Sequence, residues 1–184
     1  MYTIQNFAVK TSLSEMTIGE FERVSQIMND DTKLVIEKYI DVLEALGTPE
    51  EVINQITDDE LFAIIKDFGN YEYDDTLPQA VQAEDGYTYE AYPIGGEFVL
   101  KAIDMAKIEK AFKSSKDTFS TIVATIFKRS DLTNKEHYAD AHIKHKKTEV
   151  KNWNAAYFYP YIVYLTKKVN ANLSKKIEES NESI

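Results

Sequence analysis

The sequence predicts a mainly α-helical protein: a compact multi-helix domain with one β-hairpin excursion and a long C-terminal aromatic helix. Three observations support this fold class. Helix-start signatures recur along the chain, turn-forming residues and aromatics gather in residues 70–100, and apolar residues recur at helical spacing after Asn154. The 184 residues are enough for one domain with a substantial core. We therefore expect a single domain with an N-terminal strand or arm (1–16), a helical region (17–69), a hairpin region (70–100) and a second helical region (101–184).

Four helices with short connections are predicted for the region 17–69. A threonine followed three residues later by glutamate is the signature of a helix capping box, and it occurs here at Thr17, Thr48 and Thr57. Asp30-Asp31 and Gly47 are helix-stop signals. The expected helices are 17–29, 32–46, 49–56 and 59–68. Their expected inward residues are Phe21, Val24 and Met28 in the first helix and Val35, Tyr39, Val42, Leu43 and Leu46 in the second.

β-structure is predicted in two places. Residues Thr3 to Val9 are rich in β-branched and aromatic types, which favour a short strand or an extended arm. Asp85-Gly86 is a hairpin-turn signal, with Gln79 to Ala83 and Tyr87 to Tyr92 as the paired strands. Two strands alone are marginally stable. We therefore expect this small sheet or projecting arm to lean on the helical body, on the N-terminal strand or on another subunit.

Helices return after the hairpin. They are predicted at Ile103 to Phe112 and at Asp117 to Lys128, the latter with Phe119, Ile122, Val123 and Ile126 inside. A fourth capping box at Thr133 starts a polar, basic helix over 134–151, and residues 178–184 resemble a polar tail.

The aromatic helix that starts at the N-cap Asn154 and runs to Lys176 dominates the C-terminal part. Phe158, Ile162, Leu165 and Val169 share one face, and Pro160 is expected to kink or restart the helix. Aromatic residues circle this helix, which predicts burial on more than one side, either inside the domain or against another chain. Tyrosines suit interfaces because the ring can pack against apolar surface while the hydroxyl stays in contact with water. The predicted interface residues are Tyr157, Phe158, Tyr159, Tyr161 and Tyr164, with Tyr87 and Tyr89 of the hairpin.

Residues that could carry chemistry are few. His137, Asp140, His142 and His145 form one cluster on the polar helix, but the HExxH spacing of a metalloprotease is absent. We interpret this helix as a solvated one and keep a metal-dependent enzyme as an alternative. Paired acidic residues such as those at 58–59 stand at helix starts, where the helix dipole favours them. The absence of cysteine excludes thiol catalysis and disulfides. We predict no catalytic residue, no metal site and no cofactor.

Charge is distributed unevenly along the chain. Residues 1–98 hold 21 Asp and Glu against 5 Lys and Arg, a net charge of −16, whereas residues 99–184 hold 10 against 16, a net of +6. The overall charge of −10 argues against non-specific nucleic-acid binding, because neutralising phosphates needs dense lysine and arginine. We predict no specific nucleic-acid binding either. Two interpretations stay open. The two halves attract each other within one molecule, or the acidic side of one copy meets the basic side of the next, as in a head-to-tail ring.

Neither a signal peptide nor a membrane span is expected. The N-terminus has no basic start followed by an apolar run. The longest apolar run, Ala155 to Leu165, has about half of the ~20 residues that a span needs. A soluble intracellular protein that makes no membrane contact is the expectation.

Two stretches resemble a group of tailed-bacteriophage proteins. The first is TSLSEMTIGEFERVSQIMND, followed by a helix and a TPEEV turn, and the second is FSTIVATIFKR, followed by a polar helix and AAYFYPYIVYL. Members of this group are small accessory proteins of the tail or neck, described as tail assembly chaperones or as ring and adaptor components of the virion. No catalytic residues belong to the pattern.

The resemblance implies a non-enzymatic structural protein that forms an oligomeric ring in the neck or tail. Its partners would be other copies of itself and phage portal, tail or ring components. Its location would be the host cytoplasm during assembly and then the virion. The alternative from the same resemblance is a tail assembly chaperone that shields a tail protein before assembly.

Overall fold

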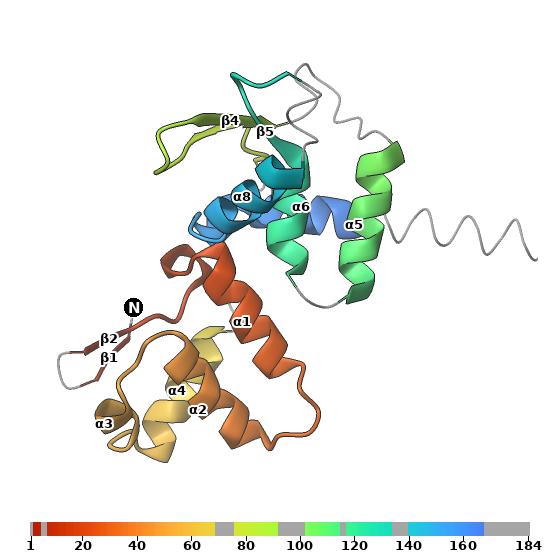
Figure 1. Ribbon diagram of the computed structural model, residues 1–184. Helices are drawn as coiled ribbons and strands as arrows, with labels where there is room; N and C mark the ends of the chain where they lie inside the picture. The colour runs from red at the N-terminus through yellow and green to blue at the C-terminus, as the bar shows by residue number, and fades with distance from the viewer. Residues whose placement is uncertain are drawn as a thin grey trace, which may run out of the picture.

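The computed structural model describes residues 2–4, 7–68, 76–91, 102–114, 117–133 and 140–167. Helices dominate, and a small antiparallel sheet completes the fold, which confirms the predicted fold class. Figure 1 shows an elongated arrangement of two lobes with α1 (Ile18–Met28) between them. We call residues 2–68 the N-terminal lobe and residues 76–167 the C-terminal lobe.

The N-terminus forms a hairpin where a single strand was predicted. Strands β1 (Tyr2–Ile4) and β2 (Phe7–Val9) pair antiparallel. The segment after β2, which belongs to the predicted arm, contains a short 3-10 turn at Leu13–Glu15, and Leu13 and Met16 are buried.

Four helices follow as predicted: α1, α2 (Val35–Ala45), α3 (Glu50–Ile53) and α4 (Asp58–Phe68). The capping box at Thr17 is present, with Glu20 N donating to Thr17 Oγ1 at 3.2 Å and Thr17 N donating to Glu20 Oε2 at 2.9 Å. The box at Thr57 is present as well. The box predicted at Thr48 is wrong. Pro49 caps α3, the Thr48 hydroxyl is buried with no partner among the described residues, and the helix is shorter than expected.

Gly47 ends α2 as the sequence predicts. Its φ is +85°, a left-handed conformation that residues with a side chain adopt at a cost. Thr48 N donates to Leu43 O and Gly47 N donates to Glu44 O, each at 2.9 Å, which completes a Schellman motif.

The predicted hairpin is present but belongs to a three-stranded sheet. Strands β3 (Ala80–Gln82) and β4 (Thr88–Ala91) pair antiparallel, and Gly86 has a φ of +83° in the turn. Ala83 N donates to Tyr87 O at 3.0 Å, so the loop has three residues and a left-handed glycine at its last position. Strand β5 (Phe127–Arg129) pairs with the other edge of β4. The hairpin is therefore held on the helical body and is not a projecting arm.

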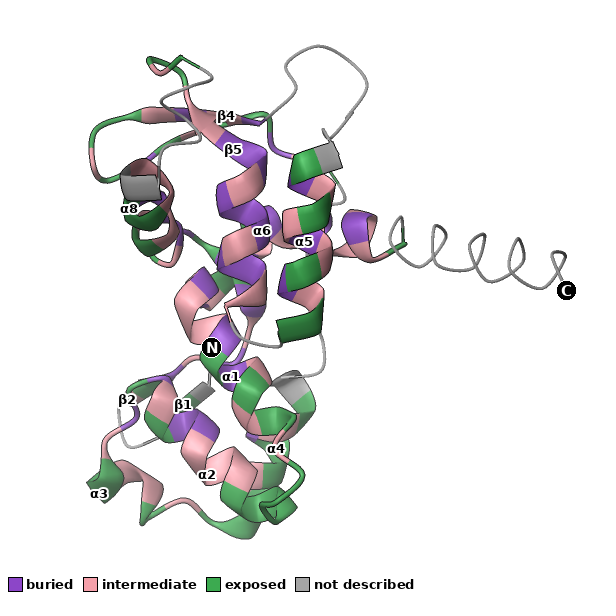
Figure 2. Ribbon diagram, turned by 45° about the vertical axis from the view of Figure 1, so that its right-hand side comes forward, coloured by how far each residue is buried: buried purple, intermediate pink, exposed green. Residues whose placement is uncertain are grey.

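Strand β5 also corrects the predicted helix Asp117 to Lys128. Helix α6 spans Thr118–Ile126, and Phe127 turns to an extended conformation because it enters the sheet. The residues expected inside α6, which are Phe119, Ile122, Val123 and Ile126, are all buried. Helix α5 (Ala102–Ser114) packs against α6, and α8 (Asp140–Val150) packs on another side of it (Figure 2).

The aromatic helix is observed over 155–167 and continues through Pro160, so the predicted restart at this proline is wrong. Asn154 caps it as predicted, because its Oδ1 accepts from Tyr157 N at 3.2 Å. Residues 168–176 of the predicted helix, the capping box after Thr133 and the tail at 178–184 lie outside the described residues.

The core of the C-terminal lobe is centred on Phe127. Its ring contacts those of Trp153, Phe158 and Tyr161 edge-on, with centroids 5.9, 5.2 and 5.4 Å away. Such edge-to-face pairs add about 0.5–1.5 kcal/mol each beyond the buried area. The N-terminal lobe has a smaller core of Val9, Leu43 and Ile64.

The start of α1 joins the two lobes. Ile18 N donates to Trp153 O at 2.8 Å and Gly19 N donates to Lys151 O at 2.9 Å. The buried carboxylate of Glu22 accepts from the backbone N of Ser120 at 2.7 Å, and burial raises the pKa of Glu22. These contacts between distant segments position α1 on the C-terminal lobe.

Candidate functional site

Three of the seven aromatic residues predicted at an interface lie in the core of the chain. Tyr89 and Tyr161 are fully buried and Phe158 is 1% exposed. Burial raises the pKa of both tyrosines, and the Tyr161 hydroxyl donates to the carbonyl of Pro78. Their contacts are within the chain, so in this fold they offer no surface to a partner.

The other four predicted residues keep some exposed surface. Tyr157 is 50% exposed and Tyr87 is 42% exposed, whereas Tyr159 and Tyr164 are half-buried. The Tyr87 ring is covered on one face by the Arg129 guanidinium, 3.4 Å from the ring centroid, a cation–π contact. The interface hypothesis therefore stands on Tyr87 and Tyr157.

A more exposed apolar surface lies at the start of α2. Leu34, Val35 and Ile36, which we call the aliphatic segment, are 72%, 61% and 56% exposed. They follow the loop between α1 and α2, at the end of the N-terminal lobe away from the sheet (Figures 1 and 2). Three consecutive large aliphatic side chains at such exposure leave much apolar surface uncovered, a feature typical of interaction sites.

Helical spacing predicts Val35, like Met28, on an inward face, and this prediction is wrong for both residues. Met28 is 38% exposed at the end of α1. The Asp30 carboxylate accepts from Thr32 N at 3.0 Å and caps a separate turn. Helix α2 therefore starts at Val35, and its first turn extends beyond the core. The run Leu34-Val35-Ile36 itself indicates exposed apolar surface, because one helical face cannot bury three consecutive residues.

The two lobes have opposite charges. The first 68 residues hold 14 Asp and Glu against 5 Lys and Arg, a net charge of −9, whereas residues 76–167 hold 11 against 13, a net charge of +2. Ion pairs among the described residues form within each half, as in Lys33–Asp41 and Lys151–Asp117. None of those that involve lysine or arginine joins the two halves. The opposite charges are thus not paired directly between the lobes in the described structure.

The histidine cluster does not assemble into a metal site in the described residues. His145 Nε2 lies 3.6 Å from a carboxylate oxygen of Asp85, and His142 is half-buried. Burial, followed by the nearby charge of Lys146, lowers the pKa of His142. His137 and the Asp140 side chain lie outside what the structure describes. Within the described part, no group of three metal-ligating side chains comes together.

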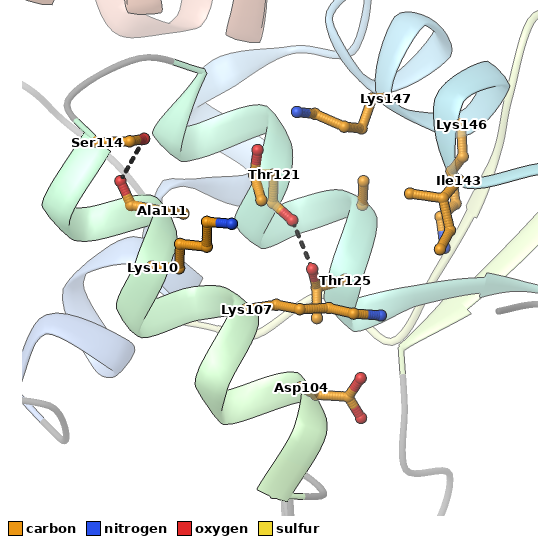
Figure 3. A pocket seen from close by; sticks show the side chains of 11 residues that line it. Asp104, Lys107, Lys110, Ala111, Ser114, Thr121, Thr125, Ile143, Lys146 and Lys147 are labelled. Atoms are coloured by element: carbon orange, nitrogen blue, oxygen red, sulfur yellow. Dashed lines mark hydrogen bonds between the residues drawn. The ribbon is translucent and has the colours of Figure 1, made fainter. Parts of the chain in front are cut away.

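A lysine-lined cavity of about 320 Å³ lies between α5, α6 and α8 (Figure 3). Lys107 and Lys110 come from α5, and Lys146 and Lys147 come from α8. Asp104, which is 1% exposed, is the only carboxylate among the lining residues. The sequence does not reveal this cavity, because it depends on how α8 packs against the pair formed by α5 and α6.

Lys146 corrects the prediction of a wholly solvated basic helix. Its side chain is 1% exposed, and its Nζ donates to the Phe127 carbonyl oxygen at 2.9 Å. Phe127 caps the C-terminal end of α6, where carbonyls lack helical partners and cations are favoured. Burial, followed by repulsion from Lys107, lowers the pKa of Lys146 to about 7, and Asp104 opposes that effect.

Among the described helices, none is both long and apolar enough to cross a membrane. Comparisons with models of protein families, with characterised proteins and with solved structures find no match to this chain.

Proposed function

We propose that this protein is a non-enzymatic assembly component whose copies bind head to tail, as in an oligomeric ring of the neck or tail of a tailed bacteriophage. The observation that carries the proposal is the aliphatic segment, exposed on a lobe of net charge −9 in a molecule whose other lobe has a net charge of +2. A second copy of this chain is the partner that best fits both features.

The aliphatic segment supplies a reason to associate. Each large aliphatic side chain gains roughly 1.5–3 kcal/mol when it is fully buried. Leu34, Val35 and Ile36 have most of their surface left to bury. A contact that covers this segment would therefore recover several kcal/mol of apolar burial, which is the core of a typical protein interface.

The charges supply the orientation. With net charges of −9 on one lobe and +2 on the other, two copies repel each other most when their N-terminal lobes meet, so contacts between unlike lobes are favoured. Such a head-to-tail contact is heterologous, and it closes into a ring when the rotation between neighbours allows it. Ile103, which is 57% exposed at the start of α5 in the C-terminal lobe, is apolar surface available to the facing copy.

The resemblance of TSLSEMTIGEF and AAYFYPYIVYL to phage tail and neck proteins supports the virion setting. In that setting the partners are other copies of the chain and portal, tail or ring proteins, and the protein acts in the host cytoplasm and then in the particle. The net charge of −10 suits a component through which DNA passes, because an acidic protein does not bind the DNA phosphates.

A triple variant tests the proposal: Leu34→Ser, Val35→Thr and Ile36→Ser. We expect the wild-type chain to sediment as a discrete oligomer and the triple variant as a monomer with an unchanged circular dichroism spectrum. The matched control is Phe62→Ser, which removes an apolar side chain that is 62% exposed on α4 of the same lobe. Oligomers of the triple variant as stable as those of wild type would contradict the proposal.

The tail assembly chaperone remains the second candidate, because an exposed aliphatic segment also suits transient binding of an unassembled tail protein. Mass spectrometry of purified particles separates the two functions. A ring component is present in the mature particle in many copies, whereas a chaperone is absent from it.

A further inference from the structure

The cavity between α5, α6 and α8 combines an apolar lining with converging positive charge. Ala111, Ala124 and Ile143 supply apolar surface. In the close-up view, Lys110 and Lys147 extend from opposite sides toward Thr121 of α6 (Figure 3). The amino groups thus approach one region of the cavity from two separate helices.

The charge inside the cavity is unbalanced. Four lysines line it, and Asp104 is the single carboxylate among its lining residues. Within the described part of the chain, neither Lys110 nor Lys147 forms an ion pair or a side-chain hydrogen bond. Two cationic groups that share a cavity repel each other, and an anion between them would relieve that repulsion.

We propose that this cavity binds a small organic anion, with its acidic group between Lys110 and Lys147 and its apolar body against Ala111, Ala124 and Ile143. Hydrogen bonds from an ammonium to a phosphate or carboxylate oxygen are about twice as strong as neutral ones. The Thr121 hydroxyl lines the same region and can donate a further bond. The volume of about 320 Å³ suits a ligand of about one ring with a charged group.

The buried end of the cavity supports the same ligand class. Lys146 and Asp104, each 1% exposed, supply buried polar groups at this end of the lining. Lys107 lines the same cavity and adds a further ammonium group there. This inference does not depend on the proposed assembly function, because it concerns a site in the C-terminal lobe away from the aliphatic segment.

The test uses phenyl phosphate as the probe and the full-length chain in ¹⁵N-NMR titrations. Inorganic phosphate, which lacks the apolar body, and phenol, which lacks the charge, are the comparison probes. We expect saturable binding of phenyl phosphate, with shifts confined to α5, α6 and α8. Each comparison probe should bind at least about tenfold more weakly.

The double variant Lys110→Gln, Lys147→Gln should weaken phenyl phosphate binding at least about tenfold. Lys110 is exposed at its place in the lining, and Lys113 is exposed as well but does not line the cavity, so Lys113→Gln is the matched control. It should change binding less than about twofold. Unchanged binding in the double variant, or inorganic phosphate that binds as well as phenyl phosphate, would overturn the inference. No saturable binding of phenyl phosphate would overturn it as well.

Discussion

Replacing Lys146 with methionine should change how the stability of the protein depends on pH. The pKa of this lysine is about 7 in the folded chain, against an ordinary value of 10.5. Between these two values the unfolded chain binds one proton more than the folded chain. The free energy of unfolding therefore rises with pH across this window, and the stability is lower below pH 7, where the buried ammonium stays charged.

The magnitude follows from the difference between 10.5 and about 7, which spans about 3.5 pH units. At 1.36 kcal/mol per unit, the full effect is about 5 kcal/mol. Between pH 7 and pH 9.5, where the experiment is practical, linkage gives about 3 kcal/mol. The methionine variant keeps the apolar stem of the side chain and loses the titrating group, so it should lack this gain.

The assay is urea unfolding followed by circular dichroism at pH 7, 8, 9 and 9.5 for the wild type and Lys146→Met. The difference between their unfolding free energies should grow by about 3 kcal/mol in favour of the wild type as the pH rises. A constant offset from the lost hydrogen bond to Phe127 does not affect this slope. The control is Lys144→Met, an exposed lysine of the same helix, whose curve should run parallel to wild type. A parallel curve for Lys146→Met would refute the burial of a titrating ammonium.

Three further changes test other parts of the structure. Tyr161→Phe should lower the unfolding free energy in urea by about 1 kcal/mol, because a buried hydroxyl loses its backbone acceptor. Tyr157→Phe, which alters an exposed tyrosine, should change it by less than half as much, and equal effects would contradict the burial of Tyr161. The unfolding free energy of the wild type should fall as the pH rises through the pKa of Glu22, because this carboxylic acid binds its proton more tightly in the folded chain than in the unfolded one. Glu22→Gln should make this fall smaller. A pH profile identical to wild type would speak against the buried Glu22 contact. Thr17→Ala should cost about 1 kcal/mol in thermal unfolding through the lost capping bond, and no loss would exclude that cap.

Local signals predicted much of the fold. The capping boxes at Thr17 and Thr57, the Gly47 helix end and the Asp85-Gly86 turn each depend on a few neighbouring residues, so the sequence is sufficient to locate them. The buried face of α6 was equally predictable, because its apolar residues recur at helical spacing.

Features that depend on distant contacts were not predictable. Phe127 continues the apolar pattern of α6, and only its pairing with β4 turns it into a strand. The charge of Lys146 suggests solvent exposure, but the carbonyl at the end of α6 gives the buried ammonium a partner. The burial of Tyr89 and Tyr161 likewise depends on the packing of the sheet on the aromatic helix. The candidate sites were therefore harder to predict from the sequence than the helices that form them.

The central claim is that copies of this chain bind head to tail through an apolar segment at an acidic end. The most direct test is size-exclusion chromatography with light scattering, at low salt and at ~0.5 M salt, where screening shortens the reach of surface charges to a few ångströms. We expect a discrete oligomer at low salt and a smaller oligomeric fraction at high salt, because salt screens the charges and leaves the apolar contact in place. A monomer under both conditions, or an oligomer indifferent to salt, would contradict it.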